Sequence, residues 1–355
     1  MSGCIVGFIA LFVQFRGTEA FWGDPWHWIQ QQVSLQKNSY SYAVKKAAPA
    51  VVNIAARPMS ESRRNSLYKR PGEEKVDGAS LGSGVIVSPD GVILTNHHVI
   101  QDARQIVVGL RDGREFFASV VGTDPETDLA VLKIKINQSP FIHLADSSKQ
   151  EVGDVVLAIG NPFGLGQTVT MGIISATGRD DLQLNTYEDF IQTDAAINIG
   201  NSGGALVNAS GDLIGISTLL FSSSGGNDGI GFAIPSRMAQ FVKNSILKYG
   251  TVVRGWLGIE SQSLTVPLAK AYGVKRDVGI LVTGVYTGGP ADKAGLRRGD
   301  VLTAINHKNT RDGRKVMNMV AQELPGSLVT LSVIRDDKPM DIQARVTTRP
   351  TIVNE

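Results

Sequence analysis

The chain has 355 residues, a length that suits two domains with an appendage. Its 35 basic and 33 acidic side chains nearly balance, so the charge gives no indication of a nucleic-acid partner. The single cysteine, Cys4, excludes an internal disulfide, and 39 glycines among many valines and isoleucines indicate a mainly β protein with many turns.

The N-terminus carries an apolar run from Gly3 to Phe15, interrupted only by Gln14 and shorter than the ~20 residues that a full membrane span needs. Three of the four tryptophans follow it within residues 22–28, where an interfacial aromatic belt would lie. We therefore interpret residues 1–28 as an N-terminal membrane anchor, truncated if the start codon is misplaced. A cleaved signal peptide and a buried core helix are the alternatives.

The next segments alternate between polar stretches and short strands. Residues 29–45 have the composition of a linker, and a strand over residues 47–54 is expected to open the folded part. Residues 57–80 are polar and charged, which is typical of a mobile loop. From residue 81 to 235 short apolar runs alternate with Gly, Asp and Asn turns, a spacing that favours a β-barrel or sandwich over a βαβ fold.

A helix is predicted over residues 236–249, because apolar side chains recur there at helical spacing. Gly250 stands where a glycine commonly ends a helix. The preceding strands and this helix together define a first domain over residues 46–250.

The first domain contains an internal repeat. Residues 84–93 align without gaps on residues 204–213, and each copy reads as strand, polar turn with glycine, strand, the pattern of a β-hairpin. The repeat predicts two similar β-domains with a cleft between them. Coincidence of common hairpin chemistry is the alternative.

Ser202 lies in the stretch Gly200-Asn201-Ser202-Gly203-Gly204, next to the second hairpin. Glycines on both sides allow a sharply bent loop, in which the N–H groups of Gly200 and Ser202 can point together at one oxygen. An oxyanion hole beside a nucleophile has this requirement. A glycine-rich turn without chemistry is the other interpretation.

A serine nucleophile needs a base, and the base needs an orienting carboxylate. His97 and His98 end the strand expected over residues 92–96, where an adjacent pair puts one side chain on each face, so only one of them can be the base. Asp128 stands where a polar turn enters an apolar strand and could accept a hydrogen bond from an imidazole; an ordinary Asx turn is the alternative. The spacing of the histidines predicts no metal site.

Three stretches resemble the catalytic motifs of the HtrA family of serine proteases: TNHHV at residues 95–99, TDLAVL at 127–132 and GNSGGAL at 200–206. Their order, His then Asp then Ser, is that of chymotrypsin-like double β-barrels. The resemblance implies that Ser202 is the nucleophile, that His98 rather than His97 is the base, and that Asp128 holds the imidazole.

The same resemblance implies an oxyanion hole made by the N–H groups of Gly200, Asn201 and Ser202, and it implies no cofactor. The family often has Pro or His at the position of Ile199, where the orientation of the peptide helps to form this hole.

A second domain is expected from residue 253 to 346, followed by a tail over residues 347–355. Residues 289–296 predict a short helix that ends at Gly295, residues 299–306 a turn and a strand, and residues 314–324 a second helix that ends before Pro325.

The second domain resembles a PDZ domain. Residues 256–259 match the loop whose N–H groups hold a peptide's terminal carboxylate, and a peptide strand would add along residues 259–262. The resemblance makes Met319 and Val320 plausible groove walls. The expected peptide-binding residues are Trp256, Leu257, Gly258, Ile259, Glu260, Ser261, Gln262, Met319 and Val320.

An anchor, one protease domain and one PDZ domain form the layout of the DegS-type members of the HtrA family. The resemblance implies a single-pass protein of the inner membrane with its catalytic domains in the periplasm. It implies cleavage of a membrane-bound anti-sigma factor when the PDZ domain binds exposed C-termini of unfolded outer-membrane proteins. It also implies a homotrimer, with Tyr40 and Tyr42 as contact candidates, and a sensor loop at residues 178–182 in which Arg179 relays peptide binding. A broad quality-control protease and a proteolytically idle PDZ adaptor are the alternatives.

Overall fold

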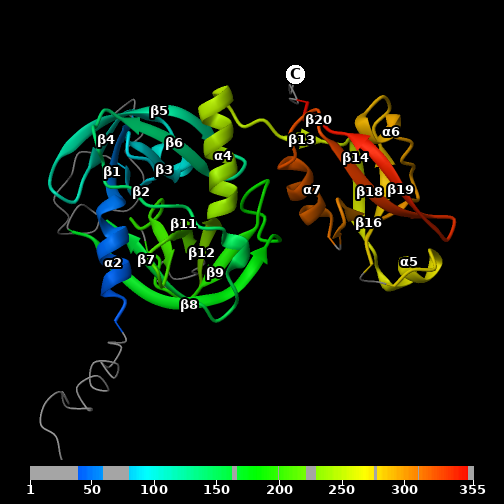
Figure 1. The fold of residues 1–355 in the computed structure, drawn as a ribbon, viewed down its shortest axis with the longest axis horizontal. Helices are drawn as coiled ribbons and strands as arrows, with labels where there is room; N and C mark the ends of the chain where they lie inside the picture. Colours follow the sequence, from blue (N-terminus) through cyan, green and yellow to red (C-terminus); the bar gives the residue numbers. More distant parts are fainter. Residues whose placement is uncertain are drawn as a thin grey trace, which may run out of the picture. The chain divides into compact units, whose positions relative to one another are not determined.

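The computed structural model describes residues 39–58, 80–161, 166–198, 200–220, 229–275, 278–310 and 312–350. Strands predominate within these ranges, which confirms the prediction of a mainly β chain with two β-barrels followed by a smaller α+β domain (Figure 1). The segments predicted as membrane anchor and as charged loop lie at residues 1–28 and, for the most part, 59–79, outside the described residues.

The first barrel closes through antiparallel strands in the order β1-β2-β3-β6-β5-β4. Its strands are β1 (Val51–Pro58), β2 (Ser80–Ile86), β3 (Val92–Asn96), β4 (Ala103–Gly109), β5 (Glu115–Asp124) and β6 (Leu129–Ile134). Strand β3 is buried at every position, and Ile54, Ile93 and Leu132 are fully buried. Burial of large aliphatic side chains at about 25 cal/mol per Å² is the main force that holds such a barrel closed.

The second barrel closes in the order β10-β11-β12-β9-β8-β7. Its strands are β7 (Val155–Gly160), β8 (Thr168–Arg179), β9 (Phe190–Thr193), β10 (Ala205–Asn208), β11 (Leu213–Leu220) and β12 (Gly231–Pro235). Its core includes Val156, Ile174, Ile191, Leu206 and Ile214. A short 3-10 helix, η3 (Ser147–Lys149), precedes β7.

The predicted sequence repeat is confirmed as a repeat of structure. The first copy forms the β2–β3 hairpin of one barrel, and the second copy forms the β10–β11 hairpin of the other. The aligned glycines Gly91 and Gly211 both have positive φ, at 85° and 76°. A turn that needs this left-handed backbone strongly favours glycine, so the alignment reflects the same turn used twice.

The start of the folded part differs from the prediction. Instead of a strand from residue 47, the chain forms helix α2 (Ser41–Ala47) and the 3-10 turn η1 (Ala48–Ala50), and β1 begins only at Val51. Ala43 and Ala47 are fully buried and four residues apart, so they lie on one face of the helix. Part of the segment assigned to the linker is therefore packed helix.

Helix α4 (Ser236–Tyr249) follows the second barrel and confirms the predicted helix. Gly250 adopts the left-handed conformation, at a φ of 76°, and donates its N–H to Ile246 O, as a C-terminal glycine cap does. None of the helices in the described ranges has the length and apolar character that crossing a membrane requires.

The last domain is built on a sheet in the order β14-β15-β16-β18-β19, with β17 paired to β16. These strands are β14 (Ile259–Ser263), β15 (Ile280–Val285), β16 (Val301–Ile305), β17 (Lys308–Asn309), β18 (Leu328–Arg335) and β19 (Lys338–Arg345). A second pair joins β13 (Gly255–Trp256) to β20 (Thr347–Thr348), so part of the predicted tail belongs to the domain.

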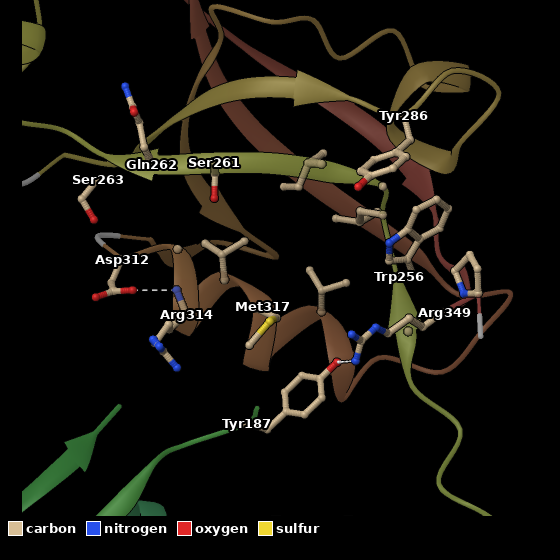
Figure 2. A pocket seen from close by; sticks show the side chains of 18 of the residues that line it. Tyr187, Trp256, Ser261, Gln262, Ser263, Tyr286, Asp312, Arg314, Met317 and Arg349 are labelled. Atoms are coloured by element: carbon tan, nitrogen blue, oxygen red, sulfur yellow. Dashed lines mark hydrogen bonds between the residues drawn. The ribbon is translucent and has the colours of Figure 1, made fainter. Parts of the chain in front are cut away.

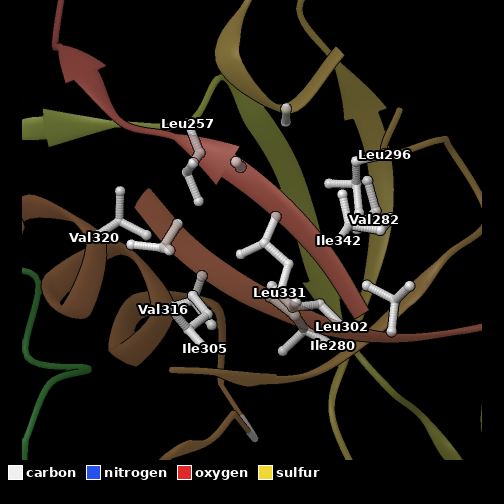
Figure 3. Close-up of a cluster of buried hydrophobic side chains, with 14 of the residues drawn as sticks. Leu257, Ile280, Val282, Leu296, Leu302, Ile305, Val316, Val320, Leu331 and Ile342 are labelled. Carbon is white, nitrogen blue, oxygen red and sulfur yellow. The ribbon is translucent and has the colours of Figure 1, made fainter. Parts of the chain in front are cut away.

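Within the described part of this domain, three helices accompany the sheet: α5 (Val266–Ala271), α6 (Pro290–Lys293) and α7 (Gly313–Ala321). Val316 and Val320 of α7 pack with Leu302, Leu331 and other sheet residues into one apolar core (Figure 3). Helix α7 ends three residues before the predicted boundary at residue 324. Asp312 caps its start by accepting a hydrogen bond from Arg314 N at 2.6 Å.

Candidate active site and peptide groove

Asp128 and His98 are joined by two polar contacts at the edge of the first barrel. His98 Nδ1 lies 2.7 Å from Asp128 Oδ2, and His98 N donates to Asp128 Oδ1 at 3.0 Å. The Asp128 side chain is 12% exposed and the His98 side chain 41% exposed. A buried carboxylate on Nδ1 leaves Nε2 as the free imidazole nitrogen, which is the arrangement that a general base requires.

The local fold that presents His98 differs from the strand end predicted for it. Residues His97–Ile100 form a single helical turn, α3, directly after β3. Asp128 stabilises this turn, because His97 N donates to Asp128 O at 3.0 Å and His98 N donates to the carboxylate. The sequence predicted two opposed histidines on a strand, and the tertiary contact with Asp128 makes them helical instead.

Thr218 of β11 joins the same network, although no motif in the sequence points to this residue. Thr218 Oγ1 donates to Asp128 Oδ2 at 2.9 Å, and Thr218 O accepts the hydroxyl of Ser202 at 2.8 Å. Ser202 therefore lies beside the His98–Asp128 pair through a shared neighbour, with its hydroxyl directed to a carbonyl. Strand β11 of the second barrel and the Asp128 turn of the first meet at this point.

The loop before Ser202 corrects one of the expected oxyanion donors. Asn201 N donates to Asn198 O at 2.9 Å, so this N–H closes a turn and does not point at a substrate. Gly200 has a φ of 96°, which a glycine adopts without strain. The N–H groups of Gly200 and Ser202 remain as the candidate oxyanion donors, as the loop geometry originally suggested. Ile199 lies outside the described residues.

The last domain carries a groove of about 830 Å³ between β14 and α7. Strand β14 is at the edge of its sheet, and its unpaired side faces this groove. Figure 2 shows Ser261 directed from β14 toward α7, with Trp256 and Tyr286 at one end of the groove. Met317 of α7 also lines the groove. An open strand edge beside an apolar helix suits a peptide that adds as an extra strand.

Most of the predicted peptide-binding residues line this groove, namely Trp256, Leu257, Gly258, Ile259, Ser261, Gln262 and Val320. Glu260 lies over Gly284 of the neighbouring strand instead. Met319 is a correction: it packs against the apolar core, and Met317 lines the groove. Two residues along a helix correspond to a rotation of about 200°, so Met317 and Met319 face opposite ways.

Gly258 explains the shape of the loop at the end of the groove. Its φ is 73°, and a Cβ at this position would lie 2.9 Å from the Trp256 ring. The Trp256 ring also meets the Tyr286 ring edge to face, with centroids 5.6 Å apart. Glycine at this position thus allows the aromatic pair to close over the loop.

The region from the end of β8 to β9 borders the groove, and the relay role of Arg179 stays a prediction. Arg179 lies on β8, and its Nε donates to Gln192 at 2.9 Å. Asp181 and Tyr187 are the residues of this region that line the groove. Tyr187 also accepts a hydrogen bond from Arg349 at 2.9 Å (Figure 2).

Glu188 holds this loop from within. Its carboxylate, 1% exposed at the residue level, accepts the N–H groups of Leu182 and Asn185, both at 2.9 Å, and that of Leu184. Burial opposes ionisation, but these backbone donors and Arg314 outweigh it and hold the pKa of Glu188 below its usual range.

No group of acidic, histidine or cysteine side chains within the described ranges is arranged to hold a metal ion. The donors at the His98 site are a carboxylate, an imidazole and hydroxyl groups, a set suited to acyl transfer.

Comparison with known proteins agrees with this geometry. Residues 82–216 match the trypsin-like peptidase domain family, and residues 255–346 match the PDZ domain family. Serine endoprotease DegS of Salmonella typhimurium is 45% identical over 318 residues, which cover 88% of this chain and 86% of DegS.

A probable periplasmic serine endoprotease, DegP-like, of Chlamydia trachomatis is 48% identical over 273 residues, which cover 77% of this chain. The matched region spans only 55% of that relative's length. Among solved structures, the HtrA-type protease AlgW with a tripeptide matches with a TM-score of 0.74 and 52% identity, over 89% of this chain and 99% of that chain.

Proposed function

Because this chain belongs to the HtrA family of serine proteases, we propose that it is an endopeptidase of the cell envelope whose PDZ domain controls cleavage. The observation that carries the proposal is the His98–Asp128 contact at 2.7 Å with Ser202 and Thr218 beside it. The groove between β14 and α7 provides a second, separate site for a regulatory peptide.

In the proposed reaction Ser202 Oγ attacks the scissile carbonyl while His98 Nε2 accepts its proton. The hydroxyl must first leave Thr218 O, the acceptor it has in the structure. Asp128 stabilises the imidazolium that forms, and His98 then gives the proton to the leaving amine. The N–H groups of Gly200 and Ser202 stabilise the negative charge that develops on the carbonyl oxygen.

The PDZ domain is proposed to bind the C-terminal end of a peptide. The backbone N–H groups of the loop at residues 256–259 would donate to the terminal carboxylate, and the peptide would pair with the free edge of β14. Apolar side chains of that peptide would contact Val320 and Met317. AlgW, the solved relative, is described with a bound tripeptide, which supports peptide binding by a protein of this family.

The finer proposal concerns the natural partners. Exposed C-termini of unfolded outer-membrane proteins would be the activators, and the periplasmic part of a membrane-bound anti-sigma factor would be the substrate. The similarity to DegS over 86% of its length supports this version. The proposal places the protein in the inner membrane through residues 1–28 and as a homotrimer, for which Tyr42, with 70% of its surface exposed, is a contact candidate.

An alternative within the family is broad quality-control proteolysis in the periplasm. The 48% identity to the DegP-like protein of Chlamydia trachomatis favours it over the idle adaptor. Membrane fractionation after an alkaline wash separates the two versions, because an anchored regulator stays in the pellet and a secreted quality-control protease does not.

The test of PDZ control is a cleavage assay with the full chain. Hydrolysis of an unstructured reporter protein is measured with a hydrophobic peptide that has a free C-terminus and with the same peptide amidated. The proposal expects stimulation only by the free carboxylate. Equal rates with both peptides would contradict control through the groove, whereas an absence of cleavage under all conditions would contradict the peptidase itself.

A further inference from the structure

Ser83 of β2 connects the first barrel to the loop that carries Ser202. Ser83 is completely buried, and its backbone N–H donates to Ser202 O at 2.8 Å. Its backbone carbonyl accepts the hydroxyl of Thr95 at 2.7 Å. Hydrogen bonds therefore hold both the N–H and the carbonyl of Ser83 in place.

The Ser83 hydroxyl has a defined direction. It accepts the backbone N–H of Asn161 at 2.9 Å and donates to Gly200 O at 2.7 Å. A hydroxyl has only one proton, so the N–H that approaches its lone pair leaves that proton for Gly200 O. The sequence reasoning did not single out Ser83, since a serine inside an apolar strand carries no motif of its own.

The peptide between Gly200 and Asn201 is consequently held at both ends. Its carbonyl accepts the Ser83 hydroxyl, and its N–H donates to Asn198 O at 2.9 Å. This peptide lies between the N–H of Gly200 and the N–H of Ser202, the two candidate oxyanion donors. Its orientation decides whether those two N–H groups can converge on one oxygen.

We propose that Ser83 is a positioning residue for the oxyanion hole. Ser83 acts on the hole through its hydrogen bond to the carbonyl of Gly200. The proposal rests on the proposed peptidase function. Gly200 has a φ of 96° and no side chain to restrict rotation, so the hydrogen bond from Ser83 supplies a restraint that the residue itself lacks. The Ser83 hydroxyl contacts Gly200 O and Asn161 N, neither of which is a reacting atom.

The loop that carries Ser202 packs closely against β2, which limits the orientations that its backbone can adopt. A Cβ on Gly203 would lie 2.1 Å from Ser83 O and 2.4 Å from Thr95 Oγ1, so the backbone after Ser202 rests directly on β2. Two buried groups, Gly200 O and Asn161 N, would lose their hydroxyl partner in a Ser83→Ala variant. The peptide could then turn to find another donor, and the two oxyanion N–H groups would diverge.

The test compares the full chain with Ser83→Ala and with the control Ser139→Ala. Ser139 is a matched control, because it is 6% exposed and its hydroxyl lies 3.0 Å from Ser88 O and 3.1 Å from Pro89 O, in contact with the turn between β2 and β3. The proposal expects Ser83→Ala to lower kcat on a fluorogenic peptide by about 10- to 100-fold, less than loss of a whole oxyanion donor, with KM unchanged.

The inhibition constant of a peptide aldehyde distinguishes loss of the oxyanion hole from a general loss of rigidity in the protein. Its adduct with Ser202 carries the oxyanion, so its inhibition constant should weaken in parallel with the fall in kcat/KM, while Ser139→Ala changes neither. Affinity for a C-terminal peptide should stay at the wild-type value. If Ser83→Ala does not fold, Ser83→Cys, a weaker donor of similar shape, takes its place and should show the same parallel losses.

Equal kcat values for Ser83→Ala and Ser139→Ala would overturn the role of Ser83. So would a fall in kcat without weaker aldehyde binding. An inactive wild-type chain would instead contradict the proposed function, and the two failures are therefore distinguishable.

Discussion

At the scale of single residues, Asp128 combines two properties. Its backbone φ is 59°, a left-handed conformation that Asp and Asn tolerate better than most residues, and its carboxylate accepts from His98 and from Thr218. The same residue therefore shapes the turn before β6 and orients the imidazole.

An Asp128→Asn substitution separates these two roles. Asparagine keeps the backbone conformation, but its amide can donate to Nδ1 and so place the imidazole proton on Nε2, where it blocks acceptance from Ser202. We expect kcat to fall by roughly a thousandfold to ten-thousandfold with little change in the melting temperature. Steady-state kinetics and a thermal melt check this.

Thr218→Val is the companion variant, because it removes one hydrogen bond at 2.9 Å and leaves the contact between Asp128 and His98 in place. It should lose far less activity than Asp128→Asn. Comparable losses in both variants would contradict the assignment of the proton-orienting role to Asp128.

The site residues that the sequence predicts act in a different way from those that only the structure reveals. Ser202, His98 and Asp128 lie in short sequence motifs whose residue types indicate a catalytic role. Thr218 acts through its hydroxyl, which donates to the Asp128 carboxylate, and through its own carbonyl, which accepts from Ser202. Ser83 acts through its hydroxyl, which donates to Gly200 O, more than a hundred residues away in sequence. Asn201 was assigned an oxyanion role that its turn to Asn198 prevents, because the direction of an N–H depends on φ and ψ and not on residue type.

At the scale of elements, Glu188 fixes the loop between β8 and β9. Because three backbone N–H groups hold the pKa of Glu188 below its usual range, the ionised form stabilises the fold. This contribution is present above the unfolded pKa of about 4.3 and is lost as the pH falls through the lower, folded pKa.

Glu188→Gln should therefore destabilise the chain by about 1–3 kcal/mol at pH 7. The NH2 group of glutamine would face backbone N–H groups, which are themselves donors and need an acceptor. The difference from wild type should shrink near pH 3.5. Urea unfolding at the two pH values measures this, and an equal difference at both would show that the charge of Glu188 does not matter.

The elements predicted correctly are those determined by local pattern. The two hairpins carry glycine turns, and α4 has both helical spacing and a glycine stop. Helix α2 was missed because residues 29–45 were predicted as a linker from their polar composition, although the two buried residues Ala43 and Ala47 have helical spacing. Helix α3 was missed because its single turn depends on hydrogen bonds to Asp128, which the local sequence does not contain.

At the scale of the whole molecule, Arg254 stands where the first domain leads into the second. Its guanidinium contacts Asp124 at 2.5 Å and Glu126 at 3.1 Å, and it stacks on the Tyr187 ring at 4.3 Å. The Arg254 and Asp124 side chains are 6% and 4% exposed. Removal of one partner from such a buried pair leaves an uncompensated charge.

Arg254→Met should lower stability by about 3–5 kcal/mol, and the double variant Arg254→Met with Asp124→Leu should recover much of that loss. Chemical denaturation of both variants tests the coupling. A single variant as stable as wild type, or a double variant worse than the single, would contradict a buried, mutually dependent pair.

The domain order was predictable because each domain carries its own motifs. The buried contacts of Arg254 could not be predicted from the sequence, because an arginine at a domain boundary is usually exposed.

The most direct measurement of the central claim is covalent labelling with a fluorophosphonate, followed by mass-spectrometric mapping of the adduct. The account predicts one adduct, on Ser202, which disappears in Ser202→Ala and forms far more slowly in His98→Ala. An adduct on another residue, or His98→Ala labelled at the wild-type rate, would contradict it.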